Sequence, residues 1–500
     1  MRVLGLGDNI FDVYERLGVA YPGGNAANVA VNARKLGHEA AYLGIIADDA
    51  WGEVMRASLR SERVETERCP AEPASTTKRC LQDRIDGERR FLRLELGDAW
   101  CAFPHLTPDL VDYIGGFDVV LTSCNAKCAE QLGALDGRGG ILSFDFGEKA
   151  KYRTREYLDS VVPHVDLVQF SCADATEEEV DRLLGSYDFT CPVLVTRGGL
   201  PPILTWKGGS AYGSVVGVGP VVDTMGAGDA FATALVCGLV GRGWRRGGPF
   251  PGTEEVESAL GDAAAHAARM CQVEGAFGHP LRLRNLRAVI FDLDGVLVES
   301  EPHYVSLMEG LASEHGASLT QEQIDGIYGS SDESQARLMG DAIGCSPDHA
   351  SKLIAEYFDA RPFNYGDLMI DGVPELVGWL RSQGFACAIA SSSSLADIQR
   401  AVRQCGLEGM FDLLVSGTQF EQTKPDPAVY LYAMRELGVR PDQTIVVEDS
   451  GYGIQAGVAA GADVLALRKP HGNICTNGAL LEFDDHEQIL NYLKAVHEVG

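Results

Sequence analysis

The chain has 500 residues, 45% of them apolar and 23% charged, a composition typical of globular proteins. At about 100–200 residues per domain, this length predicts more than one compact domain. The net charge of −29 disfavours nucleic acid and anionic membranes as partners, since both are bound through basic surfaces. The sequence has no run of about 20 apolar residues, so we expect no membrane-spanning segment.

The cysteines and the first residues bear on where the protein works. The 13 cysteines are scattered singly, without the paired spacing of a zinc site. An odd, unpatterned set is typical of reduced thiols. The opening segment, MRVLGLGDNIFD, has an early acidic residue and no long apolar core, so it predicts a buried strand rather than a signal peptide. We therefore expect a cytoplasmic protein.

Apolar runs that alternate with helical patterns predict an α/β architecture in both halves of the chain. The predicted strands are 3–6, 41–46, 119–121, 141–144 and 193–196, and then 288–291, 386–390, 413–415 and 444–447. A seam at 279–287 (HPLRLRNLR) follows an Ala-rich helical segment and precedes a new strand. We predict one domain over residues 1–284 and a second over 285–500.

Two segments interrupt these patterns. Residues 75–95 have β-rich flanks around Asp86-Gly87, a dipeptide typical of hairpin turns. Such a hairpin is either a lid or dimer contact or a simple surface excursion, and the sequence leaves both readings open. Residues 301–370 are mostly helical and follow the first strand of the second half. They predict a cap over a site at the carboxyl end of that strand.

Residues 222–231 (VDTMGAGDAF) predict a phosphate-binding turn that leads into a helix of small residues. The backbone N–H groups of Gly226, Ala227 and Gly228 would point from the helix N-terminus towards phosphoryl oxygens. Asp229 lies at the edge of this turn, where it could take a proton from an attacking hydroxyl group.

A second cluster near the N-terminus could bind sugar hydroxyls. Gly7-Asp8-Asn9 and Asp12 follow the first predicted strand, and 23–28 (GGNAAN) opens a helix. Taken singly, the glycines fit a helix-start turn and Asn28 fits a helix cap. Their occurrence together with the DTMGAGD segment favours a binding role.

These motifs resemble the ribokinase/phosphofructokinase-B family of carbohydrate kinases over about residues 1–284. The implied fold is a ribokinase-like α/β sandwich with a small β lid. Within the family, the wording is closest to the fructoselysine 6-kinases in the segments GDNIFDVY, GGNAANVAVNARKLG, SFDFGEK, VPHVDLVQFS, DTMGAGDAF and GAFGHP.

The resemblance implies ATP-dependent, Mg²⁺-dependent phosphorylation of a fructoselysine-like (Amadori) ketosugar at O6. It implies Asp229 as the catalytic base and an anion hole for ATP phosphate formed by Gly226, Ala227 and Gly228. Further roles carry over as sugar contacts (Asp12, Gly24, Asn25, Asn28), nucleotide-side contacts (Thr196, Gly198) and a water-mediated magnesium contact (Asp174). Because related lids pair, it also implies a homodimer through the hairpin.

Two positions depart from the family pattern. Ser171 stands where the family has the Asn of an Asn-x-x-Glu motif, whose acid position is Asp174. After Gly199, the stretch 200–202 (LPP) replaces one in which the family usually has another glycine. These departures could change metal binding, nucleotide affinity or base preference.

In the second half, 289–298 (VIFDLDGVLV) is an apolar strand that ends in two carboxylates. The Asp-x-Asp spacing lets Asp292 and Asp294 reach one site, and a hard cation such as Mg²⁺ would offset their repulsion. Asp292 could then attack phosphorus covalently, while Asp294 protonates the leaving oxygen and later activates water. Alone, the segment would also fit a calcium site or a structural turn.

Three further strand ends favour the phosphate-transfer reading. Ser391 ends a strand with a hydroxyl, Lys424 offers a cation for phosphate, and Glu448-Asp449 ends another strand with two acids. Together the four motifs resemble the haloacid dehalogenase superfamily, β-phosphoglucomutase-like phosphatase branch, over about residues 288–470. The resemblance implies a Rossmann-like core with a helical cap. Its implied roles are nucleophile (Asp292), acid/base (Asp294), phosphate binders (Ser391, Lys424) and magnesium ligands (Asp292, Asp294, Asp449, Glu448).

The choice between phosphatase and mutase depends on the cap. The related mutases carry an Arg in the cap loop, where this chain has 329–334 (GSSDES), without Arg. A mutase would need another cation, such as Arg337 or Arg361. We therefore expect a bifunctional sugar kinase and sugar-phosphate phosphatase. The alternatives are a mutase as second domain, and a nucleoside kinase or a non-catalytic sugar-binding module as first domain.

Overall fold

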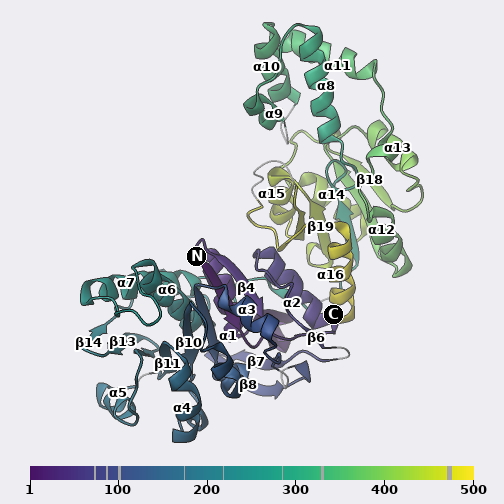
Figure 1. Ribbon diagram of the computed structural model, residues 1–500. Coiled ribbons are helices and arrows are strands. Elements are labelled where there is room, and N and C mark those ends of the chain that lie inside the picture. Colours follow the sequence, from purple (N-terminus) through teal and green to yellow (C-terminus); the bar gives the residue numbers. More distant parts are fainter. Residues whose placement is uncertain are drawn as a thin grey trace. The chain divides into compact units, whose positions relative to one another are not determined.

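The computed structural model describes residues 1–72, 75–85, 88–99, 103–173, 175–217, 219–283, 285–327, 332–469 and 476–499. The chain divides into two compact units, Met1–Leu283 and Arg284–Glu498 (Figure 1). Both units have the α/β architecture predicted from the sequence. Within the described residues, no helix is long and apolar enough to cross a membrane.

The first unit is built on an eight-stranded sheet with the order β14-β13-β12-β11-β10-β9-β1-β4. The strands from β4 to β12 are parallel, and β13 and β14 add antiparallel strands at one edge. In the sheet order their bounds are Gly209–Tyr212, Leu200–Trp206, Val193–Arg197, Leu167–Ser171, Ile141–Asp145, Val119–Ser123, Arg2–Leu6 and Glu39–Leu43. Most of these residues are buried, because helices cover both faces of the sheet.

Two apolar clusters hold the helices of the first unit to the sheet. One contains side chains of α1, α6 and α7, and the other contains those of α3, α4 and α5. These helices span Asn25–Lys35 (α1), Pro108–Gly115 (α3), Arg155–Val161 (α4), Glu177–Leu184 (α5), Ala227–Gly241 (α6) and Thr253–Met270 (α7). The helix α2 (Ala50–Ser61) and a short pair, β5 (Ile46–Ala47) and β6 (Ala71–Glu72), complete the unit.

A second, five-stranded sheet forms a lid with the order β15-β3-β2-β7-β8. Its strands are Leu281–Arg282 (β15), Val19–Gly23 (β3), Ile10–Tyr14 (β2), Arg79–Ile85 (β7) and Glu88–Glu95 (β8). The predicted hairpin is confirmed as the antiparallel pair β7–β8, and its turn, Asp86-Gly87, lies outside the described residues. The strands β2 and β3 were not predicted, so Asp12 lies on a lid strand rather than in a loop after β1.

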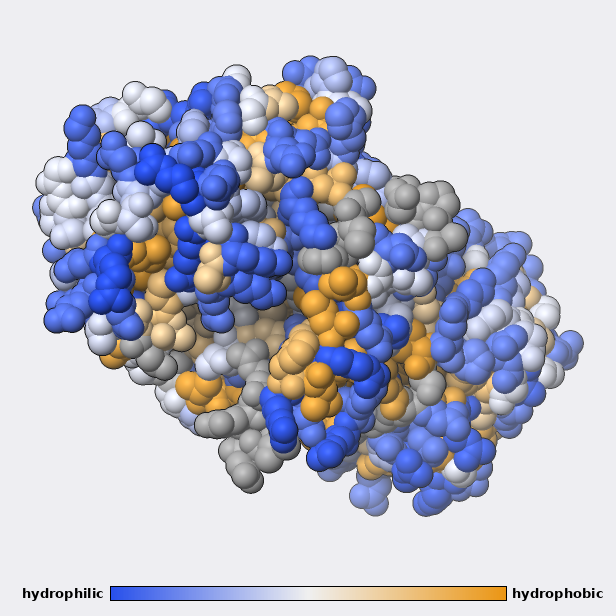
Figure 2. Space-filling view, turned by 90° about the horizontal axis from the view of Figure 1, so that it is seen from below, coloured by the Kyte–Doolittle hydropathy of each residue, from blue (hydrophilic) through white to orange (hydrophobic). Residues whose placement is uncertain are grey.

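The edge strand β8 exposes a row of apolar side chains. Phe91 is 62% exposed, and Leu92, Leu94 and Leu96 at and just beyond the strand are 39–46% exposed. On the face of the molecule seen in Figure 2, apolar side chains likewise reach the surface in patches between charged ones. An exposed apolar edge strand is a surface that a further strand can cover.

The second unit contains a six-stranded parallel sheet with the order β18-β17-β16-β19-β20-β21. In that order the strands span Leu413–Ser416, Ala386–Ser391, Ala288–Phe291, Thr444–Glu448, Asp463–Leu467 and Leu481–Phe483. The helices α14 (Ala428–Leu437) and α15 (Gly451–Ala459) pack on one face in a common apolar cluster. The remaining helices of this core are α12 (Val373–Ser382), α13 (Leu395–Gln404) and α16 (His486–Val499).

The segment between β16 and α12 is helical, as expected for a cap. It contains α8 (Glu301–Glu314), α9 (Gln321–Ile327), α10 (Asp332–Ile343) and α11 (Pro347–Asp359). These helices share an apolar cluster of their own that includes Met308, Leu311 and Met339. The cap is therefore a separately packed helical layer inserted after the first strand of the core.

Candidate active sites

The start of α6 forms the predicted phosphate-binding turn. The carboxylate of Asp223 accepts a hydrogen bond from the backbone N of Met225 (3.0 Å) and fixes the turn before the helix. Gly226 has φ +70°, and a Cβ there would lie 2.9 Å from the Cβ of Ala276, so glycine suits both the backbone and the space. The backbone N of Ala227 donates to the backbone O of Thr224 (3.3 Å), which closes the turn. The first amides of an α-helix lack the usual partner one turn earlier, so the N-terminus of α6 around Gly228 suits an anion.

Asp229 lies in the first turn of α6 and meets the start of α1. Its two carboxylate oxygens accept hydrogen bonds from the side-chain amides of Asn25 and Asn28, the latter at 2.7 Å. Burial raises the pKa of Asp229 to about 8; the charges of Asp145 and Asp8 act in the same direction, and the amide hydrogen bonds oppose them. The sequence-predicted base and two predicted sugar-binding residues are thus brought together.

Gly24 and Asp12 are the other two residues predicted to contact the sugar. A Cβ at Gly24 would come within 2.6 Å of the Cα of Asn9, so the start of α1 can pack here only without a side chain. Asp12 is buried on β2 and accepts a hydrogen bond from the side chain of Gln82 on β7. The lid therefore holds Asp12 through a contact between two of its own strands.

The nucleotide-side residues lie at the ends of β11 and β12. The backbone N of Cys172 donates to the backbone O of Thr196 (2.8 Å), which joins the position after Ser171 to the predicted nucleotide strand. Arg153 donates to the backbone oxygens of Ser171 (2.9 Å) and Gly147 (2.8 Å). Asp174 lies outside the described residues. At Ser171, the backbone oxygen thus accepts from a cation, and the backbone N donates to the backbone O of Gly147 (3.3 Å).

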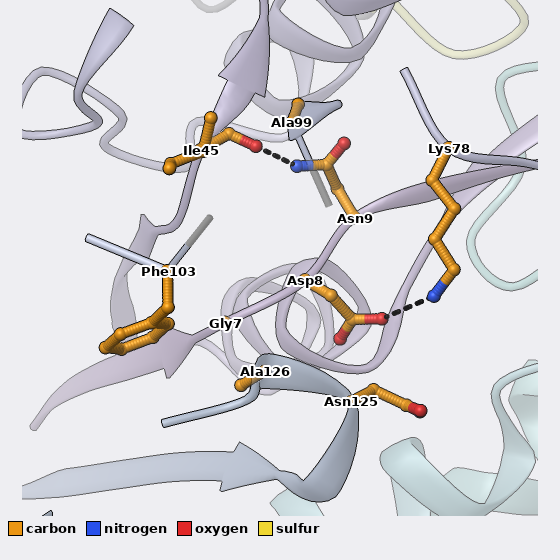
Figure 3. A pocket seen from close by; sticks show the side chains of 9 residues that line it. All are labelled: Gly7, Asp8, Asn9, Ile45, Lys78, Ala99, Phe103, Asn125 and Ala126. Carbon is orange, nitrogen blue, oxygen red and sulfur yellow. Dashed lines mark hydrogen bonds and ion pairs between the residues drawn. The ribbon is translucent and has the colours of Figure 1, made fainter. Parts of the chain in front are cut away.

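Sequence reasoning missed Asp145, near Asp229, and the partner of Asp8. Asp145, at the end of β10, accepts a hydrogen bond from the backbone N of Gly147 (2.7 Å) and contacts Asn25 at 3.5 Å. Burial raises its pKa to about 6. Asp8 and Lys78 form an ion pair in a pocket at the end of β1 (Figure 3). The strand-end position of Asp145, within SFDFGEK, was the signal that could have found it.

In the second unit, Lys424 joins the acids at two neighbouring strand ends. Its Nζ lies 2.8 Å from Asp292 Oδ1 and 2.7 Å from Glu448 Oε1, and it also donates to the backbone O of Ala390 (3.0 Å). The hydroxyl of Tyr430 donates to the same Glu448 oxygen (2.7 Å). Because β16 pairs with both β17 and β19, motifs far apart in sequence converge at one sheet edge.

These charges control one another because all three are buried. Burial raises the pKa of Asp292 to about 7, although the charge of Lys424 opposes the rise. Burial alone would raise the pKa of Glu448, but Lys424 and the surrounding hydrogen bonds hold it below its usual value. Despite burial, the two carboxylates raise the pKa of Lys424 well above its usual value, so the lysine stays charged.

A metal ion fits beside this network. Among the described residues, Asp292, Glu448 and Asp449 form a buried acidic group whose oxygens lie within 4.8 Å of one another. Both oxygens of Glu448 already accept hydrogen bonds, Oε1 from Lys424 and Tyr430 and Oε2 from Asp449 N and from Ser450. Asp292 and Asp449 therefore fit Mg²⁺ as direct carboxylate ligands, with Glu448 in support. A divalent cation would also favour the ionised form of Asp292.

The side chain of Asp294 does not belong to this acidic group. Its oxygens accept hydrogen bonds from the hydroxyls of Ser300 (2.5 Å) and Ser393 (2.6 Å). Ser391, a predicted phosphate binder, is buried, and its hydroxyl accepts from the backbone N of Ser393 (3.1 Å). Asp294 is thus held by neutral groups, and Asp292 by a cation.

Sequence reasoning also missed Lys469, which follows β20. Its side chain is 4% exposed, and Nζ lies 3.0 Å from Glu299 and 3.5 Å from Asp449. A second buried cation therefore stands next to the acids. No motif marks it, because it reaches the site only through the sheet order, in which β20 lies beside β19.

Comparison with known proteins divides the chain at the same place. Residues 14–280 match the model of the pfkB family carbohydrate kinases. The same region is 31% identical to a fructosamine kinase of Bacillus subtilis (strain 168), covering 57% of this chain and 96% of that protein. It is 25% identical to the fructoselysine 6-kinase of Escherichia coli (strain K12), covering 54% of this chain and 98% of that protein.

Residues 289–467 match the model of the haloacid dehalogenase-like hydrolases. A phosphorylated-carbohydrates phosphatase of Thermotoga maritima is 28% identical to this region, covering 42% of this chain and all of that protein. The chain therefore belongs to the pfkB family of carbohydrate kinases and carries a haloacid dehalogenase-type phosphatase domain fused to its C-terminal side.

Proposed function

We propose that the first domain transfers the γ-phosphoryl group of ATP to O6 of a fructoselysine-like (Amadori) ketosugar. The observation that carries this proposal is the position of Asp229, whose carboxylate is held by Asn25 and Asn28 at the N-terminus of α6. In this position it accepts the proton of the attacking hydroxyl, while the amides of 226–228 bind the transferring phosphoryl group. Magnesium, when bound with ATP, neutralises phosphate charge.

The choice of sugar is supported by similarity to proteins named fructosamine kinase and fructoselysine 6-kinase, each matched over nearly its full length. Asp12, Gly24, Asn25 and Asn28 are the residues we assign to the sugar. Thr196 and Gly198 are assigned to the nucleotide side, and Asp174 to a water-mediated magnesium contact. The intact Asp229 cluster argues against a non-catalytic binding module.

For the second domain we propose hydrolysis of a small phosphorylated sugar through an aspartyl-phosphate. The carrying observation is Lys424, which bridges Asp292 and Glu448 beside Asp449. Asp292 attacks phosphorus, Ser391 and Lys424 bind the phosphoryl oxygens, and Asp294 protonates the leaving oxygen and then activates water. Asp292 and Asp449 would hold Mg²⁺, which when bound would neutralise charge at the phosphoryl group.

The cap favours a phosphatase over a mutase. A mutase must bind a second phosphate, and the two cap arginines considered for this role are both engaged with acids. Arg337 pairs with Glu333, and Arg361 lies 2.7 Å from Glu314, with all four side chains well exposed. Exposed pairs of this kind lie on the solvated surface of the cap.

The test uses the full chain with a panel of acceptors and phosphate esters. Fructoselysine, fructose, adenosine and inosine are offered with ATP, and sugar phosphates, including the kinase product, are offered without it. We expect phosphorylation of fructoselysine above the nucleosides, and release of phosphate from a sugar phosphate other than the kinase product. Preference for adenosine or inosine would overturn the kinase assignment. Interconversion of sugar phosphates without phosphate release would overturn the phosphatase assignment.

We also propose that the kinase domain forms a homodimer through the lid. This proposal is supported by the exposed apolar side chains on the edge strand β8, of which Phe91 is the most exposed at 62%. Replacing Phe91 and Leu94 with serine should convert a dimer to a monomer in sedimentation analysis, and an unchanged molecular mass would count against this interface.

A further inference from the structure

A pocket opens where β1 ends, between the turn 7–9, the loop 125–126 and the start of β7 (Figure 3). Its polar lining includes Asp8, Lys78 and Asn125, and its apolar lining includes Ile45, Ala99 and Phe103. The proposed catalytic groups do not line it. The pocket therefore combines charged and apolar side chains that have no part in the proposed phosphoryl transfer.

Asp8 is the unusual residue of this pocket. Its side chain is 6% exposed, and Oδ2 lies 3.5 Å from Lys78 Nζ. The other oxygen, Oδ1, is buried and accepts no hydrogen bond from the described residues. A buried carboxylate oxygen without a donor is costly, because the water it lost has not been replaced. A ligand that brings a donor to Oδ1 would remove this cost.

The pocket adjoins the site where we place phosphoryl transfer. Gly24, at the start of α1, packs directly on the backbone of Asp8 and Asn9. The next residue along, Asn25, holds Asp229. The charges of Asp8 and Asp145 both contribute to the raised pKa of Asp229, so the three carboxylates share one electrostatic field. A cation bound at Asp8 would stabilise the ionised form of all three.

Resting on the kinase function proposed above, we propose that Asp8 binds the protonated amine of the acceptor, and so selects ketosugars that carry a cationic amine over neutral sugars. A hydrogen bond from an ammonium group to a buried carboxylate is among the stronger polar contacts. Lys78 acts as a positioning residue, because its ion pair with Oδ2 holds the carboxylate in place and leaves Oδ1 for the substrate. The apolar walls suit the carbon chain attached to the amine.

The test compares two acceptors that differ in one group. 1-Amino-1-deoxyfructose carries an ammonium group where fructose carries a hydroxyl. In the full chain, Asp8→Asn should lower kcat/KM for the amino sugar by about a hundredfold, and kcat/KM for fructose by less than about threefold. The amide keeps the shape of the carboxylate and removes its charge, so the change in the ratio of the two values reports charge recognition.

Asp83→Asn is the matched control. Asp83 also has a side chain that is 6% exposed and pairs with an arginine at 3.1 Å, but it lies on β7 outside the pocket. It should leave the ratio of the two kcat/KM values unchanged. Lys78→Met is the second variant, and it should keep the preference for the amino sugar because the Asp8 carboxylate that contacts the amine is still present. Thermal unfolding of each variant verifies that it is folded.

The outcomes separate this inference from the proposed function. Failure of the wild-type chain to phosphorylate either fructoselysine or the amino sugar overturns the proposed function and this inference with it, whereas activity on fructoselysine alone overturns only this inference. Activity on the amino sugar in the wild type, with an equal loss for both acceptors or no loss for either in Asp8→Asn, overturns only the role of Asp8. Loss of the preference in Lys78→Met but not in Asp8→Asn would overturn charge recognition by Asp8.

Discussion

The two sites hold their central carboxylates in opposite ways. In the kinase domain, the neutral amides of Asn25 and Asn28 hold Asp229, and burial raises its pKa to about 8. In the phosphatase domain, the cation of Lys424 holds Asp292, with a metal-compatible acid, Asp449, beside it. Among the described residues, the contacts of Asp229 come from neutral amides, whereas Asp292 belongs to a network of charged side chains.

This difference follows from what each carboxylate is proposed to do. A general base must accept a proton and works best with a pKa near the working pH, which burial among amides provides. A nucleophile must be ionised when it attacks phosphorus, which a lysine and a metal ion favour. The same side chain is thus adapted to two roles by the charge of its neighbours, and each prediction below probes one side of this contrast.

The largest effect is expected from Asp292→Asn. An amide cannot form the aspartyl-phosphate, so phosphatase turnover should fall by about 10⁴-fold or more. Phosphate release from a sugar phosphate measures the loss, and ATP-dependent phosphorylation by the same polypeptide is the internal control. Loss of both activities would mean that the variant damages the fold rather than the chemistry.

Next comes Lys424→Met, which removes the cation and leaves Asp292 and Glu448 buried without it. Breaking a buried ion pair from one side costs about 3–5 kcal/mol. The free energy of unfolding of the second domain, measured by urea denaturation, should fall by this amount.

Asn28→Ala, which removes only a neutral donor from Asp229, should lower the free energy of unfolding of the first domain by about 1–3 kcal/mol. Equal losses would remove the contrast between the two sites.

Asp229→Asn should reduce kinase turnover by at least ~10² if the carboxylate acts as a general base. The asparagine keeps the size of the side chain, so substrate binding should change less than kcat. Phosphatase activity of the same chain is the control here. Turnover equal to that of the wild type would exclude Asp229 as the base.

The smallest effect concerns pH. Only ionised Asp229 can accept a proton, and its pKa is raised to about 8, so the active fraction is lost as pH falls below that value. The kinase kcat/KM should therefore rise about tenfold per pH unit on the acid side of about pH 8 and then level off. Initial rates across a pH series measure this slope. A profile that is already level at about pH 6 would contradict the raised pKa.

The sequence predicted most of the two large sheets and the strand ends that carry the motifs. Both catalytic clusters combine residues that were named beforehand, such as Asp229 with Asn28 and Asp292 with Lys424. The lid strands β2 and β3 were not predicted, because each has only five residues, β2 contains an aspartate, and β3 ends in Pro-Gly, residues that are uncommon in strands. What makes them strands is pairing with distant parts of the chain: β2 pairs with β7, and β3 pairs with β2 and with β15.

The partners that fix the site side chains were harder to predict. Ser393 contacts Asp294 across 99 residues of sequence, and Lys469 contacts Glu299 across 170. Such pairs depend on which strands become neighbours in the sheet, and no local pattern carries that information. The sequence identified the residue types at the strand ends. Their hydrogen-bond partners could be found only from the folded sheet.

The short strand β15 attaches the end of the first domain to the lid sheet, directly before the second domain begins. Its two residues pair with β3 at the lid edge, and the backbone N of Leu283 donates to Gly18. The backbone N of Arg287 donates to the backbone O of Gln443 in the second domain. Only residues 284–286 therefore separate the hydrogen bond of Leu283 in the first domain from that of Arg287 in the second. A force that separates the domains would therefore reach β15 first and peel it from β3, so that under tension the lid sheet should lose a strand before either core yields.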